Sequence, residues 1–434
     1  MHHGSLFLAG LVALQSRTVQ SLPWPISVFE RQSPPAEEPD VTDLDFIRKW
    51  AAIGDSYSAG IGAGAKLSDS GSCSRYDNSY PMLLQRYDEM PTDPAPTMEY
   101  LSCSGATSPQ ILERQISTLG TGYDLITLSS GGNDVGLVDI LNACIYQWFA
   151  STGDRGCDEQ LTKTERLVND TLPGNYDALT AALKSKLNTN RKVFWTGYAR
   201  FFDDASTNCD SVTWAFWFNL IQKNFLDQAR RKRMNDLVIS VNAAIKAAVE
   251  RAGPEFVFVD YDSYFVKTRG RFCEGSTREP DANRDGLLFF QWDTDNGVTT
   301  LTRRNTDQSG FDGVVAGDFT SIDKRQDDSP PSTNTTSFED QIVSLVRDAK
   351  TANTSLEVAL HDNSGADPAY RGRQMLGIDD FIPDSILRVF HPQPAGHAII
   401  TNLLVWHIAQ QQALLQDVPW GPESGTNSES CALP

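Results

Sequence analysis

The sequence of 434 residues is acidic and has enough apolar residues to bury a sizeable core. It contains 37 Lys and Arg against 56 Asp and Glu, a formal net charge of −19, and 40% of its residues are hydrophobic. This composition excludes global disorder. It also argues against a nucleic-acid partner, because phosphate backbones are bound by clustered Lys and Arg. The one dense basic run, Arg230–Arg233, falls in a predicted helix, and we interpret it as a solvated helix face.

The N-terminus carries an apolar run, Ser5–Leu14, that predicts export. The run is too short to span a bilayer and fits the core of a secretory signal, although His2 and His3 stand where Lys or Arg is usual. No second long apolar run follows, so we expect a secreted protein without a membrane span. The expected organisation is a signal peptide (1–21), a linker (22–45), one large domain (46–415) and a polar tail (416–434). Three N-glycosylation sequons agree with export; they begin at Asn169, Asn334 and Asn353.

Seven cysteines are present, and their spacing indicates disulfides. None forms a Cys-x-x-Cys pair, and no His lies beside them at the spacing of metal ligands, which argues against a structural zinc site. An exported chain uses cysteines mainly for disulfides. Order along the chain suggests three bonds, although other pairings are open: Cys73–Cys103, Cys144–Cys157 and Cys209–Cys273. Cys431, in the polar tail, is then left over.

From Lys49 onward, apolar strand-like runs alternate with helical patterns. The predicted strands are Trp50–Gly54, Glu99–Ser102, Asp124–Ser129, Val193–Gly197 and Phe256–Tyr261. The predicted helices are Tyr80–Tyr87, Pro109–Ile116, Tyr176–Leu187, Gln228–Arg251 and Ala395–Leu415. Strands that alternate with helices of this length imply a parallel sheet covered on both faces. In such sheets, binding sites collect at the carboxyl ends of the strands.

The alternation stops between about residues 270 and 383, where Asp, Asn, Gly, Ser and Thr dominate. We expect a long irregular insertion there, partly disordered near 324–337. Its Lys324-Arg325 pair is either a processing site or an ordinary exposed pair. Asp281–Gly286 resembles the first half of a calcium loop, but Trp292 replaces the expected bidentate Glu, which favours a plain turn and no bound metal.

Polar residues that suit acyl transfer follow three predicted strands. Gly54-Asp55-Ser56-Tyr57 follows the first, Gly105 lies just after the second, and Gly131-Gly132-Asn133-Asp134 follows the third. His391-Pro392 opens the last helix. A serine needs a nearby base such as His to act as a nucleophile, and its tetrahedral intermediate needs hydrogen-bond donors. The backbone N–H groups of Ser56 and Gly105 and the amide of Asn133 are candidate donors.

These blocks resemble the SGNH hydrolases, the GDSL esterase/lipase superfamily named for its Ser, Gly, Asn and His. The resemblance covers roughly residues 47–415. It implies a flavodoxin-like three-layer α/β/α fold with a mostly parallel five-stranded sheet, and cofactor-free hydrolysis of lipid, phospholipid, carbohydrate or small-alcohol esters. The cysteine order is also similar to that of the secreted actinobacterial and fungal subgroup, which carries three disulfides.

One position departs from the family pattern. The family usually has Asp three residues before the His, but this chain has Arg388 there. Some members of the secreted subgroup use a Ser–His dyad, in which a backbone carbonyl orients the imidazole. We therefore expect the carbonyl of Arg388 to orient His391, with Asp384 or another acid from the insertion as the alternative.

Three further signals have plain structural explanations. His397 lies six residues after His391, so on a helix it faces away from the site, and we expect it to pack or cap. His361, in the insertion, has no supporting pattern. The aromatic stretch Val212–Ile221 predicts a buried helix, with an acyl-pocket lining or a lid as the alternative.

The sequence as a whole predicts a secreted, monomeric serine carboxylic ester hydrolase that acts through an acyl-enzyme on a lipid or other acyl ester. A carbohydrate acetyl ester is the alternative substrate, and it would need a more polar cleft. A non-catalytic binding protein that kept the fold is the alternative function, and the missing acid at position 388 favours it.

Overall fold

A parallel five-stranded sheet forms the centre of the fold in the computed structural model, which describes residues 43–147, 154–215, 223–275, 277–291, 294 and 384–418. Its strands are β1 (Lys49–Gly54), β2 (Thr97–Tyr100), β3 (Tyr123–Ser129), β4 (Leu187–Thr196) and β5 (Phe256–Val259). All paired strands are parallel, in the order β2-β1-β3-β4-β5. This is the flavodoxin-like order, and it confirms the predicted fold class.

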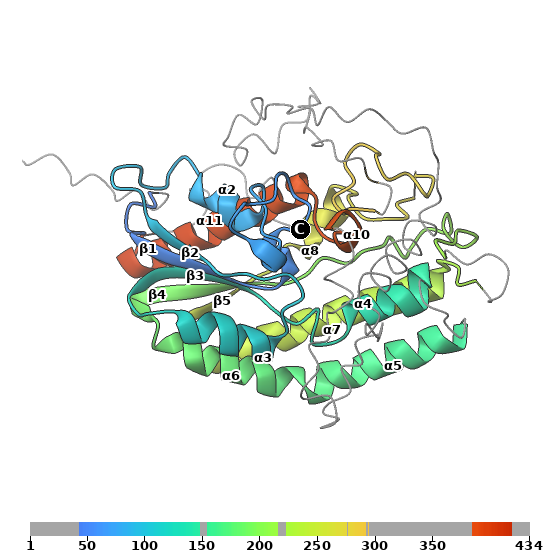
Figure 1. The fold of residues 1–434 in the computed structure, drawn as a ribbon, viewed down its shortest axis with the longest axis horizontal. Helices are drawn as coiled ribbons and strands as arrows, with labels where there is room; N and C mark the ends of the chain where they lie inside the picture. Colours follow the sequence, from blue (N-terminus) through green and yellow to red (C-terminus); the bar gives the residue numbers. More distant parts are fainter. Residues whose placement is uncertain are drawn as a thin grey trace, which may run out of the picture. The chain divides into compact units, whose positions relative to one another are not determined.

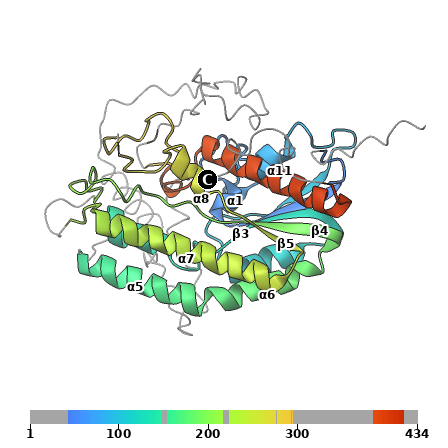
Figure 2. The same cartoon turned by 180° about the vertical axis from the view of Figure 1, so that it is seen from behind.

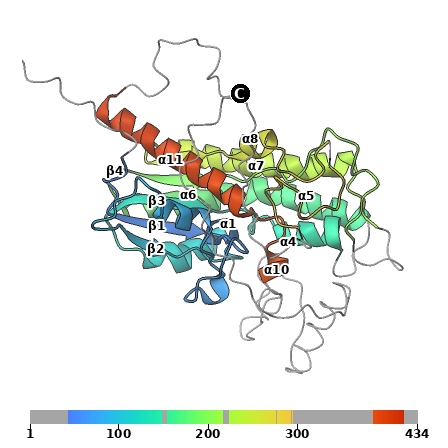
Figure 3. The same cartoon turned by 90° about the horizontal axis from the view of Figure 1, so that it is seen from above.

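Helices cover both faces of the sheet. They are α1 (Ser56–Ala59), α2 (Tyr80–Gln85), α3 (Ser108–Gln110), α4 (Leu137–Ile140), α5 (Asp154–Asp170), α6 (Leu172–Lys184), α7 (Gln228–Ala252), α8 (Asp262–Lys267), α10 (Asp384–Leu387) and α11 (Pro394–Gln416). Figure 1 shows α2 and α11 on one face and α3, α6 and α7 on the other. Seen from behind, α5 packs on α6 and α7 away from the sheet (Figure 2). Figure 3 shows α11 crossing above the strands.

The strand order places a switch point between β1 and β3. The chain passes from β1 outward to β2, returns to β3 on the other side of β1, and continues outward from there. At the carboxyl ends of the two central strands, Gly54 pairs with Ser129. Ligands of open parallel sheets bind at such switch points. The blocks that begin at Asp55 and Ser130 therefore emerge next to one another.

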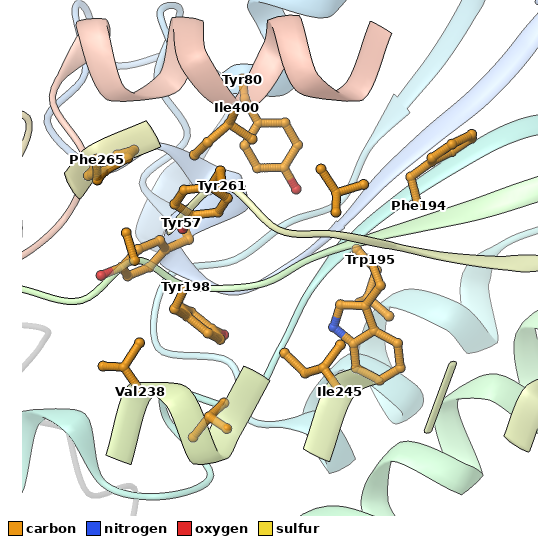
Figure 4. Packing of buried hydrophobic residues seen from close by; sticks show 14 of the residues in the cluster. Tyr57, Tyr80, Phe194, Trp195, Tyr198, Val238, Ile245, Tyr261, Phe265 and Ile400 are labelled. Carbon is orange, nitrogen blue, oxygen red and sulfur yellow. The ribbon is translucent and has the colours of Figure 1, made fainter. Parts of the chain in front are cut away.

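The strands are apolar because they are buried on both faces. Every residue of β3 and five of the six residues of β1 are buried, as expected of a parallel sheet covered by helices. Trp50 and Trp195 are fully buried among them. Figure 4 shows Trp195 beneath the sheet beside Ile245 of α7, and Tyr80 and Ile400 on the opposite side.

Three disulfides join the predicted partners: Cys73–Cys103, Cys144–Cys157 and Cys209–Cys273. The first holds the segment after β2 against the loop that follows α1. The bond between Cys209 and Cys273 connects the segments after β4 and after α8. The bond between Cys144 and Cys157 joins the π-helical turn Leu141–Tyr146 to α5, so none of the three bonds lies within the sheet.

The prediction of a solvated basic face is wrong for Arg231, which is fully buried. The first turn of α7 packs on the segment after β4, and the guanidinium fills this contact. It donates to the carbonyl oxygens of Leu226 (2.8 Å), Ser206 (2.5 Å) and Asp203 and to the carboxylate of Asp210 (2.8 Å). A buried Arg needs such partners, because an unpaired buried charge is costly.

Among the described residues, no helix is both long enough and apolar enough to cross a bilayer. Several features predicted from the sequence lie outside the described residues. The predicted features outside are the signal peptide, the sequons at Asn334 and Asn353, the Lys324-Arg325 pair, His361, Trp292 and Cys431.

Candidate active site

Ser56 lies at the carboxyl end of β1, as the first residue of α1. The carboxylate of Asp55 caps this short helix by accepting the backbone N–H of Tyr57 (3.0 Å), and the helix ends at Gly60, which has a φ of 70°. A β-carbon at Gly60 would lie 2.3 Å from that of Ser79, so only glycine fits the turn. The hydroxyl of Ser56 is thus fixed at the switch point of the sheet.

His391 meets Ser56 across 335 positions of sequence. Its Nε2 atom lies 2.6 Å from the Ser56 Oγ atom. The ring of Tyr57 lies against the imidazole, with 4.9 Å between centroids. The predicted nucleophile and base are therefore within hydrogen-bond distance, the geometry that general-base activation of a serine requires.

The carbonyl that orients His391 lies one residue later than predicted. The Nδ1 atom is 3.1 Å from the carbonyl oxygen of Val389, whereas that of Arg388 accepts the backbone N–H of His391 (2.9 Å). Phe390, which lies between Val389 and His391 in the sequence, has a φ of 64°, a left-handed conformation that turns the chain sharply. The hydrogen bond from the His391 N–H to the Arg388 carbonyl closes the turn, and the carbonyl of Val389 then faces the imidazole.

Burial lowers the pKa of His391 to about 4, and the carbonyls of Val389 and Arg388 oppose this shift. The imidazole is therefore neutral near pH 7 and able to accept a proton. The Nδ1 contact with Val389 places the ring proton on Nδ1, which leaves Nε2 as the acceptor that faces Ser56.

Asp384, the alternative orienting acid, binds elsewhere. Its carboxylate accepts from Lys66 Nζ (2.8 Å), Ser74 Oγ (2.9 Å) and Tyr76 OH (2.9 Å). These partners tie α10 to the loop after α1. Asp384 therefore anchors the segment before His391 and is not bonded to the imidazole itself.

The candidate oxyanion donors come from the carboxyl ends of β1, β2 and β3. Among the described residues, no protein atom accepts the backbone N–H of Ser56 or of Gly105. The Asn133 amide donates to the carbonyl oxygen of Ala106 (3.0 Å), directly after Gly105. The Cys103 N–H donates to the carbonyl oxygen of Gly54 (2.9 Å), so the loop that carries Gly105 is tied to the end of β1.

Asp134 connects the two loops that carry Gly105 and Asn133. Both of its oxygens accept the N–H of Ser108 (3.1 and 2.9 Å), and one accepts from the side chain of Asn175 (2.9 Å). Burial raises the Asp134 pKa to about 6, and these hydrogen bonds oppose the rise. The acid of the predicted Gly-Gly-Asn-Asp block therefore supports the neighbouring asparagine.

Sequence reasoning missed two supporting residues at this edge. The amide of Gln115 forms two hydrogen bonds with the backbone of Gly54 (2.7 and 2.9 Å). Tyr198, which follows β4, donates to Asp55 (2.5 Å). Its place just after a strand end was the signal that marks it as a candidate.

An apolar pocket opens next to these groups. Its lining is almost entirely apolar. Tyr57 and Gly132, the neighbours of Ser56 and Asn133, form part of the wall, and α4 and α7 supply much of the rest. The residues from these helices are Leu137, Ile140, Met234, Leu237, Val238 and Val241. Ligand pockets are typically lined by apolar side chains of this kind.

The weaker sequence signals are not part of this site. His397 is fully buried, and its Nδ1 atom accepts the backbone N–H of Tyr80 (3.2 Å), which confirms a packing role. In the described part of Val212–Ile221, residues 212–215 are not helical, and Trp214 is buried against Phe272. Within the described ranges, no three His, Cys, Asp or Glu residues, those of Asp281–Gly286 included, form a group that could hold a metal ion.

The sequence matches known proteins over part of its length. A model of the GDSL-like lipase/acylhydrolase family matches residues 52–280. Lipase 1 of Streptomyces coelicolor is 30% identical over 227 residues, which cover 52% of this chain and 74% of the relative. A lipase of Streptomyces rimosus is 33% identical over 153 residues, 35% of this chain and 53% of that lipase. The family match ends before His391, so the pairing of this residue with Ser56 rests on the geometry.

Solved structures are also similar. The phospholipase A1 from Streptomyces albidoflavus is 26% identical, with a TM-score of 0.43, and the match covers 53% of this chain and 86% of that one. The extracellular lipase from Streptomyces rimosus is 26% identical, with a TM-score of 0.44 and coverage of 55% and 90%.

Proposed function

Because this chain belongs to the GDSL-like lipase/acylhydrolase family, and is thus a carboxylic ester hydrolase, we propose that it is a secreted enzyme that cleaves lipid-type acyl esters through Ser56 and His391. The observation that carries the proposal is the 2.6 Å contact between Ser56 Oγ and His391 Nε2 beside an apolar pocket.

His391 carries the proton in both halves of the proposed mechanism. His391 Nε2 accepts the Ser56 proton as Oγ attacks the ester carbonyl, and the carbonyl of Val389 holds the ring through Nδ1. The imidazolium then protonates the leaving alcohol. Water attacks the acyl-enzyme in the second half of the cycle, with His391 again as the base.

Three donors stabilise the oxyanion in this proposal. They are the backbone N–H groups of Ser56 and Gly105 and the side-chain amide of Asn133. The bond from Asn133 to the carbonyl of Ala106 fixes the plane of the amide before substrate binds. Preorganised donors of this kind contribute most when no reorganisation is needed during the reaction.

The pocket supports a longer acyl chain over acetate. A chain that enters between Tyr57 and Gly132 contacts the apolar side chains of α4 and α7. Burial of each methylene contributes about 0.8 kcal/mol. An acetyl group has no chain that could reach these apolar side chains, and the pocket wall offers few polar atoms to a sugar. The names of the two matching relatives, both lipases, agree with this preference.

Secretion is supported by independent features. Three disulfides are typical of proteins that fold in oxidising compartments. The apolar run Ser5–Leu14 supports a signal peptide over 1–21, and Asn169, the one sequon in the described ranges, is exposed. The resulting proposal is a signal peptide, a linker (22–45), a catalytic domain (46–415) and a tail.

The test is hydrolysis of p-nitrophenyl esters from acetate to long-chain acyl groups by the purified protein and by Ser56→Ala. We expect kcat/KM to rise with chain length in the wild type and activity to be lost in Ser56→Ala. A fluorophosphonate probe should label only the wild type. Full activity of the variant would contradict the assignment of the nucleophile. A sharp preference for acetate would instead favour the acetyl esterase, and absence of labelling would favour the non-catalytic alternative.

A further inference from the structure

Tyr198 lies two residues after the end of β4, and its side chain is buried at the carboxyl edge of the sheet, with 5% of its surface exposed. Its hydroxyl donates to Asp55 Oδ2 (2.5 Å) and accepts the backbone N–H of Gly132 (3.2 Å). Its ring meets the ring of Tyr57 edge-on, with 4.9 Å between centroids. Figure 4 shows Tyr57 and Tyr198 beside each other, between the sheet and Val238 of α7.

The contacts of Tyr198 belong to three different parts of the site. Asp55 caps the helix that begins with Ser56. Gly132 directly precedes Asn133, and Tyr57 packs on the imidazole of His391. One side chain therefore contacts the segments that carry the nucleophile and an oxyanion donor, and the residue that packs on the base.

The hydrogen bonds of Tyr198 are well defined in direction. Asp55 uses Oδ1 to accept from Ser129 Oγ (2.6 Å) and from the N–H of Tyr57, and Oδ2 to accept from Tyr198. The backbone of Tyr198 is held by Asn242 of α7, whose amide accepts its N–H (2.8 Å) and donates to its carbonyl (2.8 Å). A phenol that gives its proton to a carboxylate presents its oxygen to the N–H of Gly132.

We propose that Tyr198 is a positioning residue, which holds the Gly132–Asn133 segment at a fixed distance from Ser56 by bridging Asp55 and the N–H of Gly132. The inference rests on the proposed function, since it assigns to Asn133 the role of an oxyanion donor. The hydroxyl of Tyr198 bonds to Asp55 and Gly132 and not to Ser56, so its proposed effect on kcat passes through the placement of Asn133, while its ring lines the apolar pocket.

The test is a double-mutant cycle that combines Tyr198→Phe with Asn133→Ala, with kcat and KM measured on a p-nitrophenyl ester. Removal of one oxyanion donor lowers kcat by about 100-fold or more. We expect Tyr198→Phe alone to lower kcat by about tenfold and to change KM by less than about twofold, because the ring is kept. In the Asn133→Ala background, the same substitution is expected to lower kcat by no more than about twofold.

Tyr123→Phe is the matched control. The Tyr123 hydroxyl also donates to a carboxylate, that of Glu99 (2.6 Å). Tyr123 is the first residue of β3, so its buried ring lies at the amino ends of the strands, away from the site. It should leave kcat unchanged while lowering the thermal midpoint about as much as Tyr198→Phe does. An equal loss of kcat from Tyr198→Phe in both backgrounds, or no loss in either, would overturn the proposal.

Two further variants keep the inference separate from folding and from the proposed function. If Tyr198→Phe does not fold, Asp55→Asn takes its place in the cycle. This variant keeps an oxygen for the N–H of Tyr57 but offers Tyr198 an amide instead of a carboxylate, and the same dependence on Asn133 is expected. Ser56→Ala reports on the proposed function alone: its loss of activity supports the ester hydrolase whatever Tyr198 does.

Discussion

His391 is buried, and no carboxylate among the described residues hydrogen-bonds its ring, which decides the pH range in which it acts as a base. Burial lowers its pKa to about 4. A free histidine has a pKa of about 6.5 and is mostly protonated at pH 5.5. The buried ring is neutral at that pH and is lost as a base only when the pH falls through about 4.

We therefore expect the acid limb of the kcat/KM profile to lie near pH 4. An unperturbed His would lower kcat/KM by about tenfold between pH 7 and pH 5.5, whereas this enzyme should lose less than about twofold. Steady-state kinetics on a soluble p-nitrophenyl ester measure the profile, and circular dichroism at each pH controls for unfolding. A limb near 6.5 in folded protein would contradict the effect of burial on His391.

A second prediction separates the Ser–His dyad from a hidden triad. Replacement of the carboxylate of a true triad lowers kcat by about 10⁴-fold. Asp384 binds Lys66, Ser74 and Tyr76 instead of His391, so Asp384→Asn should lower kcat by less than about tenfold while lowering the thermal midpoint. Measurement of kcat beside Ser56→Ala distinguishes the two cases. A loss close to that of Ser56→Ala would make Asp384 the orienting acid.

The sequence could predict the residues that meet at the site but not the one that orients the base. Ser56, Gly105 and Asn133 follow strand ends, and parallel strands bring those ends to one edge of the sheet. The choice of Val389 over Arg388 depends on the left-handed φ of Phe390. A bulky residue rarely adopts this conformation, and no sequence pattern marked it.

Among the elements, α7 links the fold to substrate preference. It spans 25 residues, packs on β5 and α6, and turns four of its side chains toward the apolar pocket. Val238 is one of them and is 8% exposed, whereas its neighbour Ile239 faces away and is 45% exposed. The two positions allow the same substitution to be compared on two faces of one helix.

Val238→Phe should shorten the acyl chain that the enzyme prefers. The added ring projects into the open pocket, so kcat/KM for long-chain esters is expected to fall by about tenfold or more, which corresponds to about 1.4 kcal/mol or more. Hydrolysis of the acetate should change little. The control Ile239→Phe should leave the ratio of long-chain to acetate activity unchanged. An equal ratio in both variants would place the acyl chain outside this pocket.

Element types were easier to predict than their limits. β4 begins at Leu187 and not at Val193, because Leu187 pairs with Tyr123 of β3. The largely exposed polar residues that follow lie in a register shift, and regular pairing resumes at Lys192. The predicted helix Pro109–Ile116 is an α-helical turn followed by a wider π-helical turn over Ile111–Gln115. In that turn the Gln115 amide reaches the backbone of Gly54, a tertiary contact that periodicity does not report.

For the whole molecule, alternation of strands and helices was enough to predict the sheet, its direction and its covered faces, because a parallel connection requires a crossover. Composition was less informative about individual charges. Arg231 lies in a basic run that reads as solvated, yet it is fully buried against four partners. The position of a charge relative to loops packed on its helix depends on tertiary structure alone.

The acid stability of the molecule should depend on His397. Burial lowers the pKa of His397 to about 3, and its Nδ1 atom accepts the N–H of Tyr80, so protonation would place two donors face to face. Because the folded pKa lies below the unfolded value of about 6.5, the stability is fully present above pH 6.5 and is lost as the pH falls toward 3. Asp134 acts in the opposite direction, because its raised pKa favours the folded state at low pH.

His397→Asn should therefore flatten the pH dependence of the free energy of unfolding, even though it removes buried atoms and lowers stability at pH 7. The asparagine oxygen can accept the N–H of Tyr80, and the amide does not become protonated in this pH range. Between pH 7 and 4.5, the wild type should lose about 2 kcal/mol more than the variant in urea unfolding with the disulfides intact. Thr401→Val provides the control: Thr401 bonds to the carbonyl of Tyr80 (3.3 Å) and does not titrate, so its loss on acidification should equal that of the wild type. An equal loss in His397→Asn would show that another group with a lowered pKa, His391 the first to examine, sets the acid limit of the fold.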